Sequence, residues 1–185
     1  PDYWGNDYQD DTYFRNGKPE ITTGYCTDVF FDEAISFIKK SKDVPFLCYL
    51  SLNAPHSPFN VPEKYYALYQ EEPQLLESQK RFYGMITNID DNFGKLSKTL
   101  ESLGIADNTI LIFTTDNGTS NGYKFNKKER KWYGYNAAMK GTKTSEYDGG
   151  HRVPLIMQWN DGNFKAGETY EGLSAHVDIL PTLAS

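Results

Sequence analysis

The chain has 185 residues, of which 38% are hydrophobic and 15% aromatic, and its 25 acidic and 19 basic side chains give a net charge of −6. This composition is typical of a folded globular protein, and it disfavours both a disordered chain and a general nucleic-acid-binding surface. No uninterrupted apolar run is long enough to span a bilayer, so we expect no membrane span.

The first part of the chain predicts one helix between two different kinds of segment. Residues 1–25 are rich in Asp, Tyr, Asn and Gly without a clear period, which indicates irregular surface structure or short strands. Apolar residues at helical spacing predict a helix over residues 27–41, with Thr27 or Asp28 as its N-cap. Residues 45–52 form a nearly continuous apolar run, which predicts a short buried strand.

The second part alternates between helix and strand. Apolar residues at three- and four-residue steps define the longest helix. The elements follow in this order: a short helix over residues 62–69, the long helix over 78–103 closed by Gly104, a strand over 108–114, a long basic loop over 118–151, a strand over 153–159, and a helix from Ala175. The alternation predicts an α/β sheet covered by helices on both faces.

The first candidate site follows the apolar strand at residues 108–114. Asp116 and Asn117 stand directly beyond it, and carboxylate and amide oxygens suit hard cations such as Ca²⁺ or Mg²⁺. In open α/β sheets, ligands bind at the carboxyl ends of the parallel strands. Read alone, the segment is equally a strand that ends in an Asp-Asn-Gly turn.

His56 follows the other predicted strand and lies between Pro55 and Pro58. A histidine in such a stiff loop suits a positioned acid, base or hydrogen-bond donor. A surface histidine in a proline-rich turn is the alternative. If both strands belong to one parallel sheet, His56 and Asp116 face the same crevice.

A glycine-rich basic stretch supplies the third candidate, Lys143. A flexible ammonium group suits a tetrahedral oxyanion, although a solvated basic loop is the usual explanation for such lysines. We interpret the charge run at residues 127–131 as solvated surface and His176 as structural. Asp90 and Asp91 are neighbours on a helix and therefore point about 100° apart, so we do not read them as a carboxylate pair.

These blocks occur in an order that resembles one family. The matching segments are residues 53–59, 83–96, 113–118, 140–143, 147–154 and 175–182. Together they cover almost the whole chain, which looks like the central part of a type I, formylglycine-dependent sulfatase of the alkaline phosphatase superfamily.

The resemblance implies an α/β fold that is part of an alkaline-phosphatase-like mixed sheet with helices on both faces. Residues 1–185 would then be a partial catalytic domain without its N-terminal, nucleophile-bearing part and its C-terminal part. By the same resemblance, Asp116 and Asn117 are ligands of a divalent cation, usually Ca²⁺. Lys143 holds the sulfate and stabilises its leaving oxygen, His56 contacts the sulfate or protonates the leaving group, and Arg152 is structural.

The family's nucleophile, a formylglycine made within a Cys/Ser-x-Pro-x-Arg motif, has no counterpart in this sequence. Cys26 is followed by Thr-Asp-Val and Ser57 by Pro-Phe-Asn. Because Ca²⁺ takes about six to eight oxygen ligands, Asp116 and Asn117 make an incomplete site. We therefore expect the isolated chain to be inactive and to bind metal weakly.

The implied substrate is a sulfated small molecule or a sulfated carbohydrate, and the implied compartment is the periplasm or the exterior of the cell. One alternative is a phosphoryl or phosphonate ester hydrolase, or a phosphotransferase, of the same superfamily, with a Thr or Ser nucleophile and two transition metals. The chain has only three histidines and none beside Asp116, which favours a single Ca²⁺. A non-catalytic scaffold domain is the second alternative.

Overall fold

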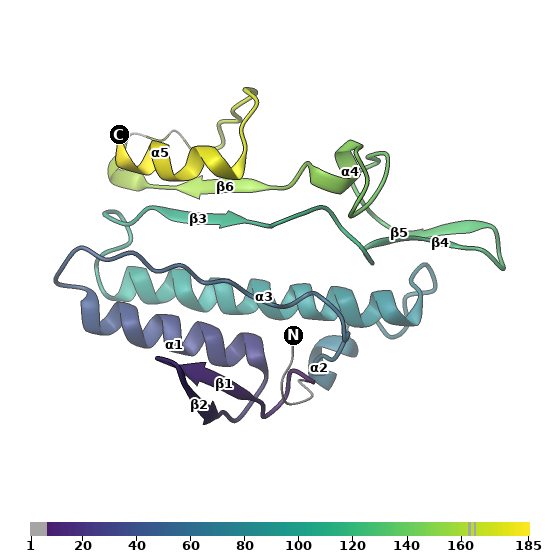
Figure 1. The fold of residues 1–185 in the computed structure, drawn as a ribbon, viewed down its shortest axis with the longest axis horizontal. Helices are drawn as coiled ribbons and strands as arrows, with labels where there is room; N and C mark the ends of the chain where they lie inside the picture. The colour runs from purple at the N-terminus through teal and green to yellow at the C-terminus, as the bar shows by residue number, and fades with distance from the viewer. Residues whose placement is uncertain (1–6, 163, 165) are drawn as a thin grey trace.

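The computed structural model describes residues 7–162, 164 and 166–185. Residues 1–6, which belong to the stretch expected to be irregular, lie outside this description. One half of the described chain is helical and contains α1 (Cys26–Ser41), α2 (Glu63–Tyr66) and α3 (Glu77–Ser102) (Figure 1). Both α1 and α2 pack against α3, so this long helix is the central element of the helical half.

The apolar faces of α1 and α3 form the main core. Phe31, Ile35 and Ile38 from α1 are buried against Leu96 and Leu100 from α3. These residues recur at three- and four-residue steps, as the sequence predicted. The position of α1 is confirmed to within one residue, since it begins at Cys26 instead of Thr27.

The predicted N-cap of α1 is wrong. Tyr25 occupies that position, and no side chain caps the helix. The Oδ1 atom of Asp28 instead accepts hydrogen bonds from Nδ2 of Asn88 (2.7 Å) and of Asn92 (2.6 Å). The Asp28 carboxylate therefore links the two helices instead of capping α1.

The C-terminal end of α3 is confirmed as a glycine-closed one. Gly104 has a φ of +69°, the left-handed conformation that glycine adopts without strain. Its N–H donates to the Glu101 carbonyl, and the N–H of Ile105 donates to the Leu100 carbonyl. These two bonds form a Schellman motif and satisfy carbonyls that the helix end leaves open.

The strands of the described residues pair antiparallel in three two-stranded sheets. The pairs are β1 (Thr12–Arg15) with β2 (Lys18–Ile21), β3 (Leu111–Thr114) with β6 (Leu155–Gln158), and β4 (Tyr123–Asn126) with β5 (Lys131–Gly134). Thr114 at the end of β3 therefore lies opposite Leu155 at the start of β6. The expected parallel pairing of residues 45–52 with residues 108–114 is not found among the described residues, where β3 pairs with the antiparallel β6.

The predicted buried strand at residues 45–52 is also wrong. The segment forms no β-ladder with the described residues, because it has no hydrogen-bonded neighbour there. Its side chains alternate: Cys48 and Leu50 pack on the core of α1 and α3, whereas Leu47 and Tyr49 are 81% and 87% exposed. It is an extended segment with one covered face.

The long loop at residues 118–151 contains structure that the sequence reading overlooked. It holds the β4–β5 hairpin and the short helix α4 (Asp148–His151). Beyond β6, a 3₁₀ turn at His176–Asp178 leads into α5 (Ile179–Ala184), in agreement with the helix expected from Ala175. Figure 1 draws α5 above β6 and the α1–α3 pair below β3.

Candidate functional site

The tip of β3 is fastened to the glycine-rich loop that carries Lys143. The N–H of Gly118 donates to the Gly150 carbonyl (2.9 Å), and the N–H of Lys143 donates to the Thr119 carbonyl (2.8 Å). A Cβ on Gly118 would lie 2.0 Å from the Gly149 carbonyl oxygen, so only glycine permits this approach. Two of the three predicted site segments are thus held side by side.

Asp116 and Asn117 lie at this junction, and each has a side-chain oxygen without a hydrogen-bond partner among the described residues. Asp116 is exposed, and no hydrogen bond or ion pair joins its carboxylate to another residue of the described ranges. Asn117 donates from Nδ2 to the Gly118 carbonyl at 3.0 Å, which leaves its Oδ1 free to accept. The two side chains offer the hard oxygen ligands that Ca²⁺ prefers.

These two ligands do not make a complete metal site. Within residues 7–162, 164 and 166–185, no group of three or more His, Cys, Asp and Glu side chains could hold a metal ion. The oxygens of Asp116 and Asn117 therefore fit at most one part of a calcium site.

Lys143 differs from the neighbouring Lys140 in what surrounds its ammonium group. Lys140 Nζ lies 3.6 Å from the centre of the Tyr147 ring, a cation–π contact. Lys143 is half-buried, and its ammonium group has no ion pair with any described residue. Of the two, Lys143 is the lysine left available to an anion.

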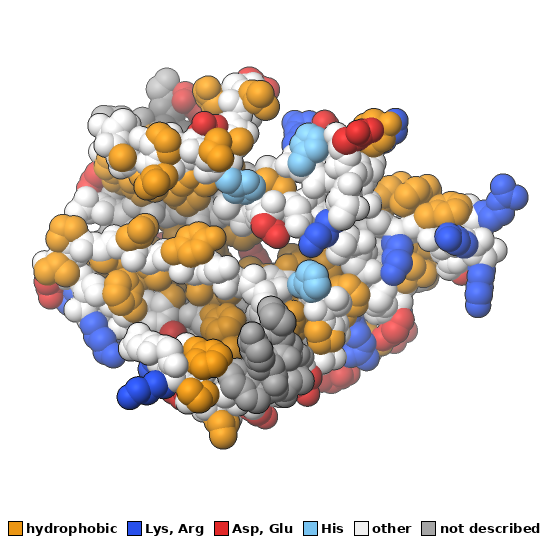
Figure 2. Space-filling model, in the orientation of Figure 1, with side chains coloured by type: hydrophobic (Ala, Val, Ile, Leu, Met, Phe, Trp, Pro, Cys, Tyr) orange, Lys and Arg blue, Asp and Glu red, His pale blue; other side chains and the backbone are white. Residues whose placement is uncertain are grey.

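His56 lies on a separate loop with a well-defined backbone. The Tyr8 hydroxyl, on a buried side chain, donates to the His56 carbonyl at 3.1 Å. The Nδ1 atom of the exposed His56 ring lies 2.9 Å from the Ser57 carbonyl oxygen. In the described part of the chain, no hydrogen bond, ion pair or ring contact links His56 to Asp116, Asn117 or Lys143. Figure 2 shows histidine, acidic and basic side chains around the hollowed middle of one face.

Two further residues belong to this neighbourhood. His176 places Nε2 2.8 Å from the Thr115 carbonyl oxygen, directly before Asp116. Asn53 has a buried Oδ1 without a hydrogen-bond partner among the described residues, at the start of the loop that carries His56. An amide follows both apolar segments, Asn53 after residues 45–52 and Asn117 after β3. This parallel could have singled out Asn53 from the sequence.

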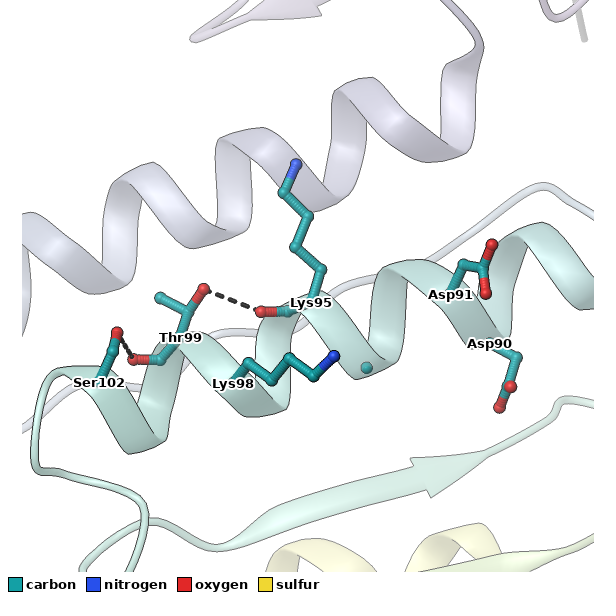
Figure 3. Close-up of a pocket in the computed structure, with 7 residues that line it drawn as sticks. Asp90, Asp91, Lys95, Lys98, Thr99 and Ser102 are labelled. Atoms are coloured by element: carbon teal, nitrogen blue, oxygen red, sulfur yellow. Dashed lines mark hydrogen bonds between the residues drawn. The ribbon is translucent and has the colours of Figure 1, made fainter.

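A hollow of about 550 Å³ lies along α3, away from these residues. Asp90 and Asp91 border it and point in different directions, as expected for helix neighbours (Figure 3). Lys95, also on its border, pairs with Asp32 of α1. The polar groups do not converge, so the structure gives this hollow no chemistry.

Neither cysteine is an activated nucleophile. Both are free thiols; Cys26 is fully buried and Cys48 half-buried. Burial raises the pKa of the Cys26 thiol to about 11 and also raises the pKa of Cys48. A reactive cysteine needs the opposite shift.

Comparison with known proteins places these motifs in a family. The family model described as Sulfatase matches residues 2–185. The chain belongs to the sulfatase family. It is 31% identical over 179 residues to the uncharacterized sulfatase YdeN of Escherichia coli, covering 95% of this chain and 30% of the relative. It is 32% identical over 174 residues to human N-acetylgalactosamine-6-sulfatase, covering 92% of this chain and 30% of the relative.

The fold agrees with this assignment. The crystal structure of Ps i-CgsB in complex with k-i-k-neocarrahexaose superposes with a TM-score of 0.64 at 33% identity, over 78% of this chain and 30% of that one. The sulfatase chain thus has the mixed α/β fold of the alkaline-phosphatase-like kind. It spans about 30% of the length of these two curated relatives.

Proposed function

We propose that the whole protein containing this sulfatase chain hydrolyses sulfate esters of a carbohydrate. The observation that carries the proposal is the family match over residues 2–185. The backbone bonds that join the Asp116–Asn117 segment to the Lys143 segment support it. They bring two candidate ligands of a cation close to a lysine that can bind an anion.

Each candidate residue has a role that follows from its chemistry. Cleavage of a sulfate ester builds negative charge on the non-bridging and leaving oxygens. The Lys143 ammonium group, whose backbone is bonded to the Thr119 carbonyl, would hold those oxygens. His56 would donate a hydrogen bond or a proton at the leaving oxygen. Asp116 and Asn117 would supply two oxygen ligands to Ca²⁺, which with a formylglycine carried outside these 185 residues would provide charge neutralisation and the nucleophile.

Relatives support a carbohydrate as the substrate. One is named N-acetylgalactosamine-6-sulfatase, and another, an ulvan-active sulfatase of Formosa agariphila, is 27% identical over 98% of this chain and 38% of its own length.

The residues the structure describes contain no helix long and apolar enough to cross a membrane. From the family resemblance, we propose the periplasm or the exterior of the cell as the compartment of the whole protein.

The test is an assay of the whole protein, produced with its formylglycine, on 4-nitrophenyl sulfate and on 4-nitrophenyl phosphate. The sulfate ester is expected to be the faster substrate. Lys143→Ala is expected to lower kcat by about 10²–10³, the cost of one lost oxyanion donor in other hydrolases. Lys98→Ala, which removes an exposed lysine of α3, is the matched control and should leave kcat within about twofold, as for other surface changes.

Faster turnover of the phosphate would move the protein to the phosphoryl-transfer branch of the superfamily. Turnover of neither ester would favour a scaffold domain. A folded Lys143→Ala variant with unchanged kcat would remove Lys143 from the mechanism and leave the sulfatase assignment to the ester comparison.

A further inference from the structure

The β4–β5 hairpin carries three aromatic rings on one face, and these rings contact one another. In the strand register, Phe125 stands opposite Trp132, with Tyr123 on the same face. The Tyr123 and Trp132 rings stack with centroids 4.5 Å apart and 9° between their planes. Phe125 and Trp132 are nevertheless 41% and 50% exposed, so the stack offers a ring surface to solvent.

The hairpin is rich in positive charge, with Lys124 and Lys131 on the face opposite the aromatic stack and the other cations in the turn. Residues 123–134 contain five Lys and Arg side chains and one Glu, in a chain whose net charge is −6. The single carboxylate, on the exposed Glu129, accepts hydrogen bonds from two other hairpin residues, from the Asn126 amide (2.9 Å) and from the Tyr133 hydroxyl. Within the described ranges, none of the five cations has an ion pair; they are Lys124, Lys127, Lys128, Arg130 and Lys131.

The base of the hairpin is fixed to α3. Gln79, fully buried in the first turn, donates from Nε2 to the Asn121 carbonyl (3.0 Å) and the Tyr133 carbonyl (2.9 Å). The Tyr83 hydroxyl donates to the Gly122 carbonyl at 2.8 Å. Figure 1 shows the hairpin reaching past the end of α3, and Figure 2 shows basic side chains around its tip. These hydrogen bonds fix the orientation of the hairpin relative to α3.

In sequence, the hairpin lies between the two halves of the candidate site. It begins shortly after Gly118 and returns to Asn136, whose Nδ2 donates to the Gly141 carbonyl (3.1 Å) just before Lys143. A hairpin in this position can contact a long substrate whose reacting end lies at the loops of Asp116 and Lys143.

We propose that the β4–β5 hairpin binds the sulfated polysaccharide chain beyond the ester that is cleaved. This inference rests on the proposed sulfatase function and extends it to a polymeric substrate. The Trp132 face stacks on a pyranose ring, while lysines of the turn pair with neighbouring sulfate groups. An anionic polymer matches the unpaired positive charge, and a flat sugar ring matches the exposed indole.

The test measures affinity of the whole protein by electrophoresis in gels that contain dextran sulfate or unsulfated dextran. Trp132→Ala and Lys127→Gln/Lys128→Gln are each expected to weaken binding to dextran sulfate about tenfold. The matched control is Lys39→Gln/Lys40→Gln, which removes two exposed lysines at the end of α1 and should change the affinity less than about twofold. Dextran should not retard the protein.

Two results would overturn the inference. One is unchanged affinity in both hairpin variants, which would leave the aromatic stack a purely structural feature. The other is equally tight, equally lysine-dependent binding to double-stranded DNA or to anionic phospholipid vesicles, which would make the hairpin a general polyanion surface. The lysine variant changes only exposed side chains, so it keeps the test decisive if Trp132→Ala fails to fold.

Hydrolysis of 4-nitrophenyl sulfate separates this inference from the proposed function. If the protein hydrolyses the small ester and the hairpin variants bind the polymer as tightly as wild type, only the inference about the hairpin is refuted. Absence of turnover would refute the sulfatase function whatever the gels show.

Discussion

Asn88, fully buried in the middle of α3, donates a hydrogen bond of 2.7 Å from Nδ2 to the Oδ1 atom of Asp28 in the first turn of α1. Asn92, one turn further along α3, donates to the same oxygen at 2.6 Å. A charged acceptor that two amides share is a stronger link than neutral pairs provide. The two main helices are therefore joined by a polar contact as well as by their apolar faces.

Asp28→Ala is expected to lower the free energy of unfolding by about 2–3 kcal/mol. The reason is that two buried amide donors lose their charged acceptor. Urea denaturation followed by circular dichroism measures the change. Asp32→Ala is the matched control, since its carboxylate, one turn along α1, makes an exposed pair with Lys95. The control should cost less than about 1 kcal/mol. Equal losses in the two variants would show that the Asp28 network contributes no more than a surface ion pair.

Gly118→Ala is expected to separate the tip of β3 from the loop that carries Lys143. The new methyl group would lie 2.0 Å from the Gly149 carbonyl oxygen, so one of the two backbones has to move. We expect faster amide hydrogen exchange at positions 118 and 143, together with a loss of activity in the whole protein. Gly94→Ala is the control, because a Cβ there meets nothing within 4 Å. It should stabilise α3 by up to about 1 kcal/mol. Unchanged exchange at Lys143 in Gly118→Ala would contradict this account of the junction.

Local pattern predicted much of this fold, and non-local pairing accounts for most of what it missed. The limits of α1 and α3 follow from apolar spacing and, for α3, from Gly104, because helices are specified by neighbours in sequence. Residues 45–52 have the composition of a strand, but a strand needs a partner that composition does not reveal. The turn at residues 127–130 has no Gly, Asn-Gly or Pro, so nothing marked the β4–β5 hairpin.

For the candidate site, the sequence supplied the residues, whereas the contacts between their segments came only from the fold. Asp116, Asn117 and Lys143 were singled out by residue type and by family resemblance, and the backbone bonds between their loops then place them near one another. The antiparallel course of β3 and β6 was not readable from either strand alone. The contact of His176 with the Thr115 carbonyl depends on how the folded chain brings the two segments together, which residue type does not reveal.

We expect the isolated 185-residue chain to bind Ca²⁺ much more weakly than the whole protein does. With only Asp116 and Asn117 as ligands, the 185-residue chain should bind Ca²⁺ no more tightly than about 1 mM, the weak end of protein sites. Titration calorimetry measures this directly. In the whole protein, removal of metal with EDTA should abolish hydrolysis of 4-nitrophenyl sulfate, and added Ca²⁺ should restore it.

Asp116→Ala should weaken the restoration by Ca²⁺ in that experiment. Asp90→Ala, a change of an exposed carboxylate on α3, should not alter it. Tight calcium binding by the isolated chain would mean that ligands beyond Asp116 and Asn117 lie within it. Activity that survives complete chelation would exclude a metal role for both.

The thiol of Cys26 predicts a specific dependence of stability on pH. Burial raises its pKa to about 11, whereas an exposed thiol titrates near 8.5. Between these values the unfolded chain loses its proton and the folded chain keeps it, so the free energy of unfolding falls as the pH rises from about 9 to 11. Cys26→Ala should flatten this decline, measured as the difference from wild type in urea midpoints at pH 8 and pH 10.5.

The difference from wild type is needed because burial also raises the pKa of the neighbouring Tyr25, whose titration remains in both proteins. An independent readout is alkylation by iodoacetamide at pH 8, followed by mass spectrometry. Cys26 should react more slowly than the half-buried Cys48 in the folded chain, and the two should react alike in urea, because only the fold distinguishes them. Fast modification of Cys26 without denaturant would show that the first turn of α1 opens readily, and the predicted pH dependence would then disappear with it.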